Sequence, residues 1–420
     1  ELPDNKKNKK EKHVGYYLID KGEELLLSNI LGKKYKKYSN REKTKIYIAT
    51  NWIISLLLTV FIVSCIDISV LMKFIIGLFI LIPIQSLVIQ IIQYILGKIL
   101  KPKLIPKIDM SGGVPKEDLT CVVIPTILKE PNRVRELVKK LEVYYLANKS
   151  ENMYFALLGD CSASSSKDED FDDIIIETGK EEIEKLNKKY ANENEPIFTF
   201  YYRKRTWNDS ENSYIGWERK RGLLHQFNSL LLGEDKYIEN FHTCPQNVEN
   251  QILKTPKYVI TLDADTNLIL DSGLELIGAM AHILNKPILN EEKNCVIDGY
   301  GIMQPRVGID LLSCRKSLFT ELFAGNGGTD SYTNAIFDVY QDNFGEGIFA
   351  GKGIYDLKIF YDVMKDKIPE NVVLSHDLLE GCYVRSALVT DVQLMDGYPI
   401  GYNSYKSRQH RWIRGDFQIA

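Results

Sequence analysis

The stretch Pro256-Lys-Tyr-Val-Ile-Thr-Leu-Asp-Ala-Asp265-Thr266 decides the fold of this chain. Its apolar, β-branched run from Tyr258 to Leu262 predicts a buried strand that ends at two carboxylates, Asp263 and Asp265. Alternate residues of a strand share a face, so both carboxylates can reach one cation. Hard oxygen ligands in this arrangement suit Mg²⁺ or Mn²⁺ carrying a phosphorylated substrate. A short Asp-x-Asp is common by chance, so this motif needs support from the rest of the chain.

Two other phosphate-handling motifs do not fit the letters. The phosphatase signature Asp-x-Asp-x-Thr requires threonine where this chain has Asn267. The segment Gly345-Glu-Gly-Ile-Phe-Ala-Gly-Lys352-Gly is similar to a P-loop, but Glu346 and Gly353 occupy the places of its first glycine and its Ser/Thr. We expect this glycine-rich segment to let backbone approach a sugar or phosphate closely.

Strands and helices are predicted to alternate beyond Pro102. The expected strands cover 121–127, 154–159, 197–202, 258–262 and 296–304, and the expected helices cover 132–147, 168–192, 217–232, 274–284 and 378–388. Apolar strands alternating with helices indicate an α/β fold whose mostly parallel sheet is covered on both faces. Ligands of such sheets bind beyond the carboxyl ends of the strands, where Asp160, Asp263 and Asp265 fall.

Two apolar runs upstream, 46–66 and 74–96, are each about one bilayer span long. They predict a transmembrane hairpin within 46–100, between a lysine-rich segment over 1–45 and a globular domain over 101–420. The link between the runs carries one lysine, whereas both outer flanks are rich in cations: Lys33, Lys34, Lys36, Lys37, Arg41, Lys43 and Lys45 before, and Lys98, Lys101, Lys103 and Lys107 after. The positive-inside rule therefore predicts a multi-pass protein of the cytoplasmic membrane whose flanks and domain face the cytoplasm.

Composition narrows the function further. The net charge of −3 gives no field that would favour nucleic acid. Seven scattered cysteines without paired spacing indicate reduced thiols, not a disulfide framework. The chain begins without methionine and stops inside an amphipathic segment, so we expect a piece of a longer protein, truncated at its C-terminal end.

Candidate ligands for a nucleotide sugar come from two further places. Asp160 ends a predicted strand, where it can accept a hydrogen bond from a base or ribose or simply cap a helix. Six cations flank the start of a predicted helix, where they can form an anion site for a diphosphate or remain a solvated face: Arg203, Lys204, Arg205, Arg219, Lys220 and Arg221. We select Lys220 and Arg221 from this group.

Two downstream motifs can complete the chemistry. Ser375-His376-Asp377 begins a predicted helix, so Asp377 is either a general base or a cap, with Glu380 a weaker second base candidate. Arg408-Gln-His-Arg411-Trp412 combines cations with an indole. Trp412 can stack on a sugar and Arg411 can hold a phosphate, or both can anchor a membrane-interface helix. Together with the Asp pair, these motifs suggest a nucleotide-sugar glycosyltransferase.

The ordered motifs resemble those of processive glycosyltransferases of the GT-A (Rossmann-like) fold such as cellulose synthase: Val122-Val-Ile-Pro125, Asp160, Asp263-Ala-Asp265, Ser375-His-Asp377 and Arg411-Trp412. Longer stretches resemble the glycosyltransferase family 84 region of cyclic β-1,2-glucan synthases: His13-Val-Gly-Tyr-Tyr-Leu, Trp217-Glu-Arg-Lys-Arg-Gly, Gly299-Tyr-Gly-Ile-Met-Gln-Pro-Arg306, Asp338-Val-Tyr-Gln-Asp342, Gly351-Lys-Gly-Ile-Tyr-Asp356, Leu374-Ser-His-Asp-Leu-Leu-Glu-Gly381 and Arg408-Gln-His-Arg-Trp. The resemblance spans nearly the whole chain.

The resemblance implies inverting transfer of glucose from UDP-glucose to the 2-hydroxyl of a growing β-1,2-glucan, with Mg²⁺ or Mn²⁺ as cofactor. It implies that Asp160 contacts uracil, Asp263 the ribose or metal, and Asp265 the metal. It further implies that Asp377 is the base, with Arg411 at the diphosphate and Trp412 at the acceptor sugar.

The chain departs from the wider Gln-x-x-Arg-Trp motif, because Gln409 lies one residue too close to Trp412, so no role is carried over to it. The family also has C-terminal cyclising and phosphorylase-like domains, which are expected partners of this piece.

Two other functions stay open at this point. One is a GT-A synthase of another β-glucan or of a glycolipid. The other is a non-catalytic membrane sensor that binds a sugar nucleotide, which would need no general base at Asp377.

Overall fold

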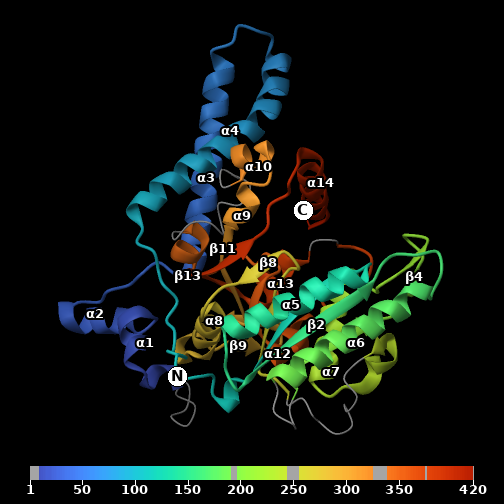
Figure 1. Ribbon diagram of the computed structural model, residues 1–420. Coiled ribbons are helices and arrows are strands. Elements are labelled where there is room, and N and C mark those ends of the chain that lie inside the picture. Colours follow the sequence, from blue (N-terminus) through green and yellow to red (C-terminus); the bar gives the residue numbers. More distant parts are fainter. Residues whose placement is uncertain (1–8, 191–195, 244–254, 325–337, 374–375, 420) are drawn as a thin grey trace. The chain divides into compact units, whose positions relative to one another are not determined.

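The computed structural model divides the chain into two compact units (Figure 1). The first comprises Glu1–Leu104 with Ile336–Gly347, and the second comprises Ile105–Ala335 with Ile348–Ala420. The structure describes residues 9–190, 196–243, 255–324, 338–373 and 376–419. Ser375 of the predicted Ser-His-Asp motif lies outside the described residues.

The first unit is built around two long apolar helices, α3 (Asn40–Ser64) and α4 (Val70–Ile99). They pack as an antiparallel hairpin, because Gly77 lies against Thr59 and Val63 near one end and the Gln93 amide donates to the Tyr47 hydroxyl near the other. Their apolar segments have mean hydropathies of 2.2 and 2.5. Both helices are long and apolar enough to cross a membrane, and most of their surface is not buried by protein.

Shorter elements complete this unit: a 3-10 turn (Lys9–Lys12), α1 (Val14–Ile19), α2 (Glu23–Leu31) and a π-helix (Tyr340–Phe344). The π-helix belongs here because the Lys43 ammonium donates to the Asn343 carbonyl and the Phe344 ring packs on Tyr47. A capping box, with Ser39 and Glu42 exchanging hydrogen bonds, starts α3 six residues before the apolar run.

The second unit contains a nine-stranded sheet in the order β6-β3-β2-β1-β7-β12-β11-β13-β8. Six strands run in one direction, and β6, β12 and β8 run against them. The strands are β6 (Phe241–Thr243), β3 (Phe198–Arg203), β2 (Met153–Cys161), β1 (Thr120–Leu128), β7 (Tyr258–Thr261), β12 (Gly353–Asp356), β11 (Ile302–Ile309), β13 (Ser386–Asp396) and β8 (Thr266–Leu268). The predicted α/β class, a mostly parallel sheet preceded by two apolar helices, is confirmed.

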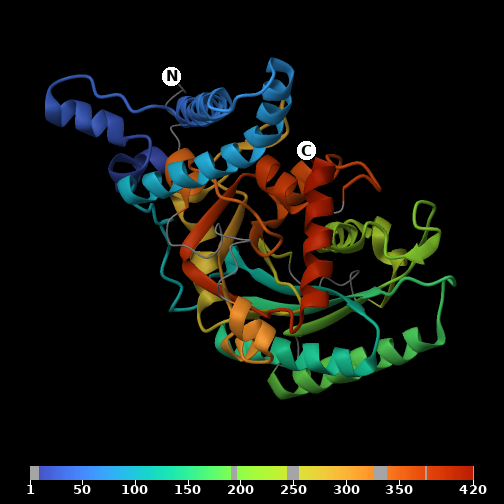
Figure 2. The same cartoon turned by 90° about the horizontal axis from the view of Figure 1, so that it is seen from above.

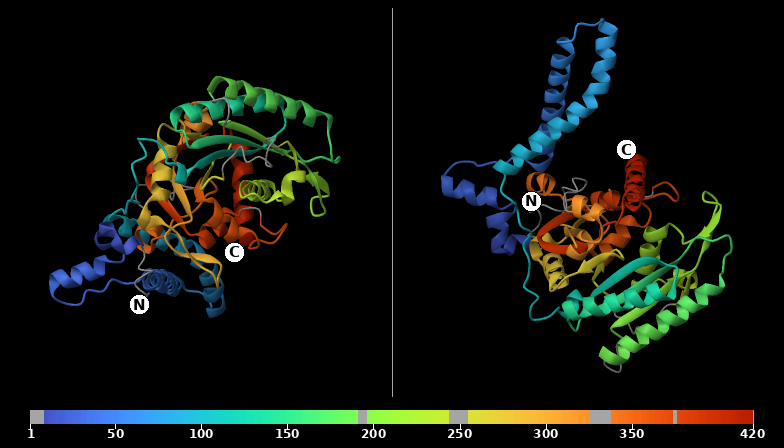
Figure 3. Two further views of the ribbon diagram at one scale, coloured as in Figure 1. Left: turned by 90° about the horizontal axis from the view of Figure 1, so that it is seen from below. Right: turned by 45° about the horizontal axis from the view of Figure 1, so that its top comes forward.

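Helices cover both faces of this sheet (Figures 2 and 3). Alternate residues of β1 divide between two cores, with Val122 and Ile124 in one and Cys121 and Val123 in the other. The first core includes α5 (Pro131–Ala147), α6 (Asp170–Tyr190) and α8 (Ser272–Ala281), and the second includes α7 (Arg219–Leu231), α12 (Leu357–Met364) and α13 (Asp377–Val384). Burial on both faces explains why the strands are apolar without alternation.

The remaining elements lie at the margins of the sheet. They are two small hairpins, β4 (Thr206–Asn208) with β5 (Ser213–Ile215) and β9 (Ile288–Asn290) with β10 (Cys295–Asp298), and the helices α9 (Leu311–Cys314), α10 (Leu318–Phe323) and α14 (Tyr402–Ile419). Three short 3-10 turns cover Lys116–Asp118, Asp235–Asn240 and Ile283–Asn285.

Most predicted elements agree with the structure to within three residues at each end, and two differ by more. The strand expected over 296–304 is two strands, because Gly299 adopts a left-handed conformation (φ +65°) and lies directly against the Lys286 carbonyl. The helix expected over 378–388 ends at Val384, where Arg385 also has a positive φ of +57°. The chain then enters β13, a strand that was not predicted.

Candidate active site

The Asp263-Ala-Asp265 motif forms the turn that joins β7 to β8. The Leu262 amide still donates to β1, and the Thr266 amide donates to the Asp263 carbonyl 3.0 Å away. β8 then pairs antiparallel with the end of β13, opposite Asp396. This places Asp263 and Asp265 at the carboxyl end of the parallel strands, where the sheet order predicts ligands to bind.

Two lysines from distant parts of the chain hold the Asp263 carboxylate. Lys220, in the first turn of α7, donates to Oδ1 at 2.5 Å, and Lys352, just before β12, lies 3.1 Å from Oδ2. Burial alone would raise the pKa of Asp263, but the two ammonium groups outweigh it and hold the pKa well below its usual range. The two ammonium groups therefore favour the ionised form of Asp263.

Asp265 has different surroundings. Lys352 also pairs with Asp396, which accepts a hydrogen bond from the Thr266 hydroxyl at 2.6 Å. In the described part of the chain, no side chain donates a hydrogen bond to the Asp265 carboxylate. Burial, together with the negative charges of Asp396 and Asp263, raises its pKa. Lys352 opposes this rise, and Lys140, which donates to the neighbouring Ala264 carbonyl at 3.0 Å, also attracts the Asp265 carboxylate without pairing with it.

Asp377 lies near the ion pair between Asp263 and Lys220, next to Gly351. Its carboxylate lies against Gly351, where a Cβ atom would come within 2.7 Å of Oδ1, and Gly351 has a left-handed φ of +80°. The Gly351 carbonyl accepts a hydrogen bond from Lys220 at 2.9 Å, so one ammonium connects Asp263 with the segment that contacts Asp377. Burial raises the pKa of Asp377, and Glu380 and Asp263 add to the rise while His376 and Lys220 oppose it.

The helix-cap reading of Asp377 does not fit this geometry. Asp377 is the first residue of α13, and His376 occupies the N-cap position without a side-chain capping bond. The carboxylate is directed at Gly351 and is partly open to solvent, with a side-chain exposure of 28%.

Asp160, by contrast, is enclosed. Arg203 donates to both of its carboxylate oxygens, at 3.0 and 2.8 Å, and both side chains are buried. Gly216 packs directly on the same carboxylate, where a Cβ atom would clash. Arg203 also donates to the carbonyls of Trp217 and Arg219, so the pair fixes the start of α7. A contact between Asp160 and uracil stays a prediction.

The other predicted cations are largely engaged elsewhere. Arg221 pairs with Glu218 at 2.6 Å and donates to the Ile368 carbonyl, and Arg219 pairs with Glu211 at the surface. Arg205 forms a buried pair with Asp172. Lys220 is the cation of the original six that contacts Asp263, and a donor-binding role for Arg221 stays a prediction.

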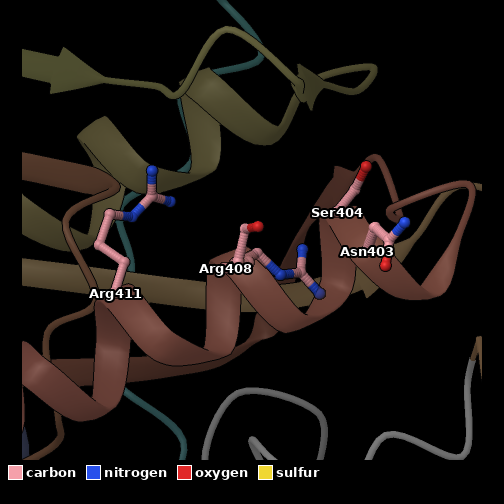
Figure 4. Close-up of a pocket in the computed structure, with 5 residues that line it drawn as sticks. Asn403, Ser404, Arg408 and Arg411 are labelled. Atoms are coloured by element: carbon pink, nitrogen blue, oxygen red, sulfur yellow. The ribbon is translucent and has the colours of Figure 1, made fainter.

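Arg411 and Trp412 both lie on α14, and Figure 4 shows Arg411. One side of this helix lines an open cavity of about 500 Å³ with the residues Asn403, Ser404, Ser407, Arg408 and Arg411. The Arg408 guanidinium lies 4.9 Å from the centroid of the half-exposed Trp412 indole. In the described structure, no hydrogen bond or ion pair joins Arg411 or Trp412 to the group around Asp263. The roles predicted for both residues remain untested.

Two members of the site were not among the predicted site residues, Lys352 and Asp396. Lys352 stood in the glycine-rich segment that fails as a P-loop, and the lysine between Gly351 and Gly353 was the signal that could have identified it. Asp396 offered no signal, because it ends β13, which sequence periodicity did not predict.

Comparisons with known proteins bear on the family. No protein-family model matches the sequence. The chain is 41% identical over 322 residues to the curated cyclic β-(1,2)-glucan synthase NdvB of Rhizobium meliloti (strain 1021). This alignment covers 76% of the chain but 11% of the relative, so the chain spans about a ninth of that protein. The resemblance predicted from the motifs is confirmed.

A solved galactosyltransferase, LgtC in complex with donor and acceptor sugar analogues, is 12% identical. The match covers 66% of this chain and 87% of that one with a TM-score of 0.27, which is too low to carry an argument.

Replacing Lys352 with methionine should lower the melting temperature at pH 7, because Asp263 and Asp396 lose a shared cation. A carboxylate whose folded pKa is depressed contributes stability above its unfolded pKa of about 3.9 and loses it as the pH falls further. The deficit of Lys352→Met should therefore shrink below about pH 4. Thermal unfolding of the purified protein at both pH values measures this, with the exposed Lys236→Met as control. An equal deficit at both pH values would assign the effect to lost packing.

Proposed function

We propose that this chain is a membrane-bound inverting glycosyltransferase. In this proposal it is a homologue of one region of the cyclic β-(1,2)-glucan synthases. It transfers glucose from UDP-glucose to the 2-hydroxyl of a growing β-1,2-glucan. The observation that carries the proposal is the cluster of Asp263, Lys220, Lys352 and Asp377 at the carboxyl end of the sheet. It supports the proposal because cations that suit a diphosphate lie near a carboxylate that could act as a base.

The charges of the cluster fit a divalent cation. Two ammonium groups, Lys220 and Lys352, face the carboxylates of Asp263, Asp265 and Asp396, with Asp377 also close by. Asp265 forms no ion pair in the described structure, since Lys352 pairs with Asp263 and Asp396 and Lys140 donates to the Ala264 carbonyl. Asp265, with Asp263, would hold Mg²⁺ or Mn²⁺, as hard oxygen ligands do. When bound, the ion would neutralise charge that develops on the leaving diphosphate.

In this proposal, Lys220 and Lys352 bind the diphosphate of the donor. Both ammonium groups lie within 3.1 Å of Asp263 and reach the edge of the sheet from opposite neighbours, α7 and β12. A diphosphate bound there would share these ammonium groups with Asp263. The ammonium groups would offset the charge of the diphosphate and fix the position of the diphosphate.

Asp377 would act as the general base. Its carboxylate takes the proton of the acceptor 2-hydroxyl as that oxygen bonds to C1 of glucose. The C1–oxygen bond to the diphosphate breaks, and its electron pair leaves with UDP. Attack from the face opposite the leaving group inverts the anomeric carbon. The raised pKa of Asp377 brings this base closer to neutral pH, where a general base is most efficient.

The acceptor and the membrane complete the proposal. Arg411 would contact the diphosphate and Trp412 would stack on the acceptor glucose, since indole faces and guanidinium groups suit these ligands. The helices α3 and α4 would cross the cytoplasmic membrane with the domain in the cytoplasm, as the lysine-rich flanks indicate. In the full-length protein, cyclising and phosphorylase-like domains would act on the product.

Two competing functions make different use of the same site. A synthase of another β-glucan or of a glycolipid would share the donor site and differ in the linkage of its product. A sugar-nucleotide sensor would need the lysines and the metal ligands but no base. The exposure of Asp377 beside Gly351 favours an enzyme over a sensor.

Asp265→Asn should weaken metal-dependent binding of UDP, because it removes charge from the proposed metal ligand. Calorimetry with and without Mg²⁺ or Mn²⁺ should show a loss on the order of 10–100-fold in affinity. Wild type in excess EDTA should match the variant, and the exposed carboxylate variant Asp366→Asn should bind as wild type does. Tight UDP binding by wild type in EDTA would remove the metal from this account.

Asp377→Asn should abolish transfer while preserving the donor site. The amide keeps the size of the side chain but cannot take a proton, so the rate should fall on the order of 10²–10⁴-fold. The dissociation constant for UDP, measured by calorimetry, should change little. Wild-type turnover by Asp377→Asn would exclude it as the base and favour the sensor if UDP still binds.

A further inference from the structure

The buried His376 lies between two carboxylates, and one of them belongs to Asp377, the proposed base. The Nδ1 atom of His376 lies 2.8 Å from Oε1 of Glu380 and 3.6 Å from Oδ1 of Asp377. His376 is 7% exposed and Glu380 is 5% exposed. The three residues occupy one turn at the start of α13, so the helix itself fixes their spacing.

The surroundings favour the imidazolium form of His376. Burial alone would lower the pKa of His376, but Glu380 and Asp377 outweigh it and raise the pKa above its usual value. A neutral imidazole would leave the buried Glu380 carboxylate without a cation in its closest contact. The Glu380–His376 pair therefore places a positive charge beside Asp377.

A nearby cation would favour the ionised form of Asp377. The charged groups that face it are His376 and Glu380 on α13, Lys220 on α7 and Asp263 beyond β7. Lys220 is bound at 2.5 Å to Asp263 and donates to Gly351, so its charge is shared. Burial and the two other carboxylates all favour a protonated Asp377, which could not accept the proton of an acceptor hydroxyl.

We propose that His376, held as imidazolium by Glu380, is a positioning residue that keeps Asp377 ionised and directed at the substrate. The inference rests on the proposed function, since it concerns the base of that reaction. His376 touches neither donor nor acceptor in this role and acts through Asp377. The role predicts a specific dependence on charge at position 376, which packing alone would not produce.

The test is the pH dependence of kcat in the full-length, membrane-reconstituted protein. In His376→Gln, loss of the cation should move the acidic limb of the profile to higher pH by about one unit, which is about a tenfold loss of kcat on that limb. The alkaline plateau should stay within about twofold of wild type. The KM for UDP-glucose and the dissociation constant for UDP should not change, because Lys220 and Lys352 remain.

A second variant separates charge from shape. His376→Lys restores a cation that can pair with Glu380, so its acidic limb should return close to the wild-type position. If His376 serves packing or capping, glutamine should be tolerated at least as well as lysine, and the profile should keep its wild-type position in both variants. His225→Gln controls for loss of a partly buried histidine, because His225 stacks on Tyr361 and should leave the profile unchanged.

The outcomes distinguish this inference from the proposed function. Loss of transfer in Asp377→Asn with a wild-type profile in His376→Gln would keep the base and overturn the role of His376. Full transfer in Asp377→Asn would overturn both. If His376→Gln has not folded, as shown by a loss of UDP binding, His376→Lys decides between the two roles. A wild-type acidic limb in His376→Lys supports the positioning role. UDP binding by His376→Lys without turnover at any pH overturns it.

Discussion

The ion pairs between Asp263 and two lysines organise the candidate site. Lys220 and Lys352 are 132 positions apart in the chain, and both reach one carboxylate at the end of β7. These pairs connect the first turn of α7 and the segment before β12 to the central strands. Without them, the carboxylates of Asp263, Asp265 and Asp396 would repel one another, with Lys140 acting on them only through space. The same ammonium groups that stabilise this turn in the free protein are those that we propose for the diphosphate.

The sequence predicted the class of fold because its strongest signals are local. The apolar run before Asp263 and the two spans upstream have lengths and patterns that allow few alternatives. The antiparallel strand β12 and the long strand β13 were not predicted, because β12 is four residues long and β13 was partly absorbed into a predicted helix. Their places in the sheet depend on pairing with β7 and β11, which no local pattern contains.

The site was predictable in its residue types but less so in its partners. The strand–turn pattern identified Asp263 and Asp265 as neighbours at one sheet edge, and the structure brings Lys220 and Asp377 to the same group. The pattern could not show that Asp160 would be enclosed by Arg203, or Arg221 by Glu218, because a charge run does not reveal which cation faces inward. Lys352 and Asp396 could be identified as members of the site only from the register of β12 and β13 in the sheet.

The most direct test of the account is the linkage of the product made by the full-length protein from radiolabelled UDP-glucose. Methylation analysis of the polymer should give 2-linked glucose as the main residue from wild type and no polymer from the enzyme without its base at Asp377. Glucose linked through another position would assign the chain to a different β-glucan synthase. Binding of UDP-glucose without any polymer or glycolipid product would contradict the enzyme and leave a sugar-nucleotide sensor.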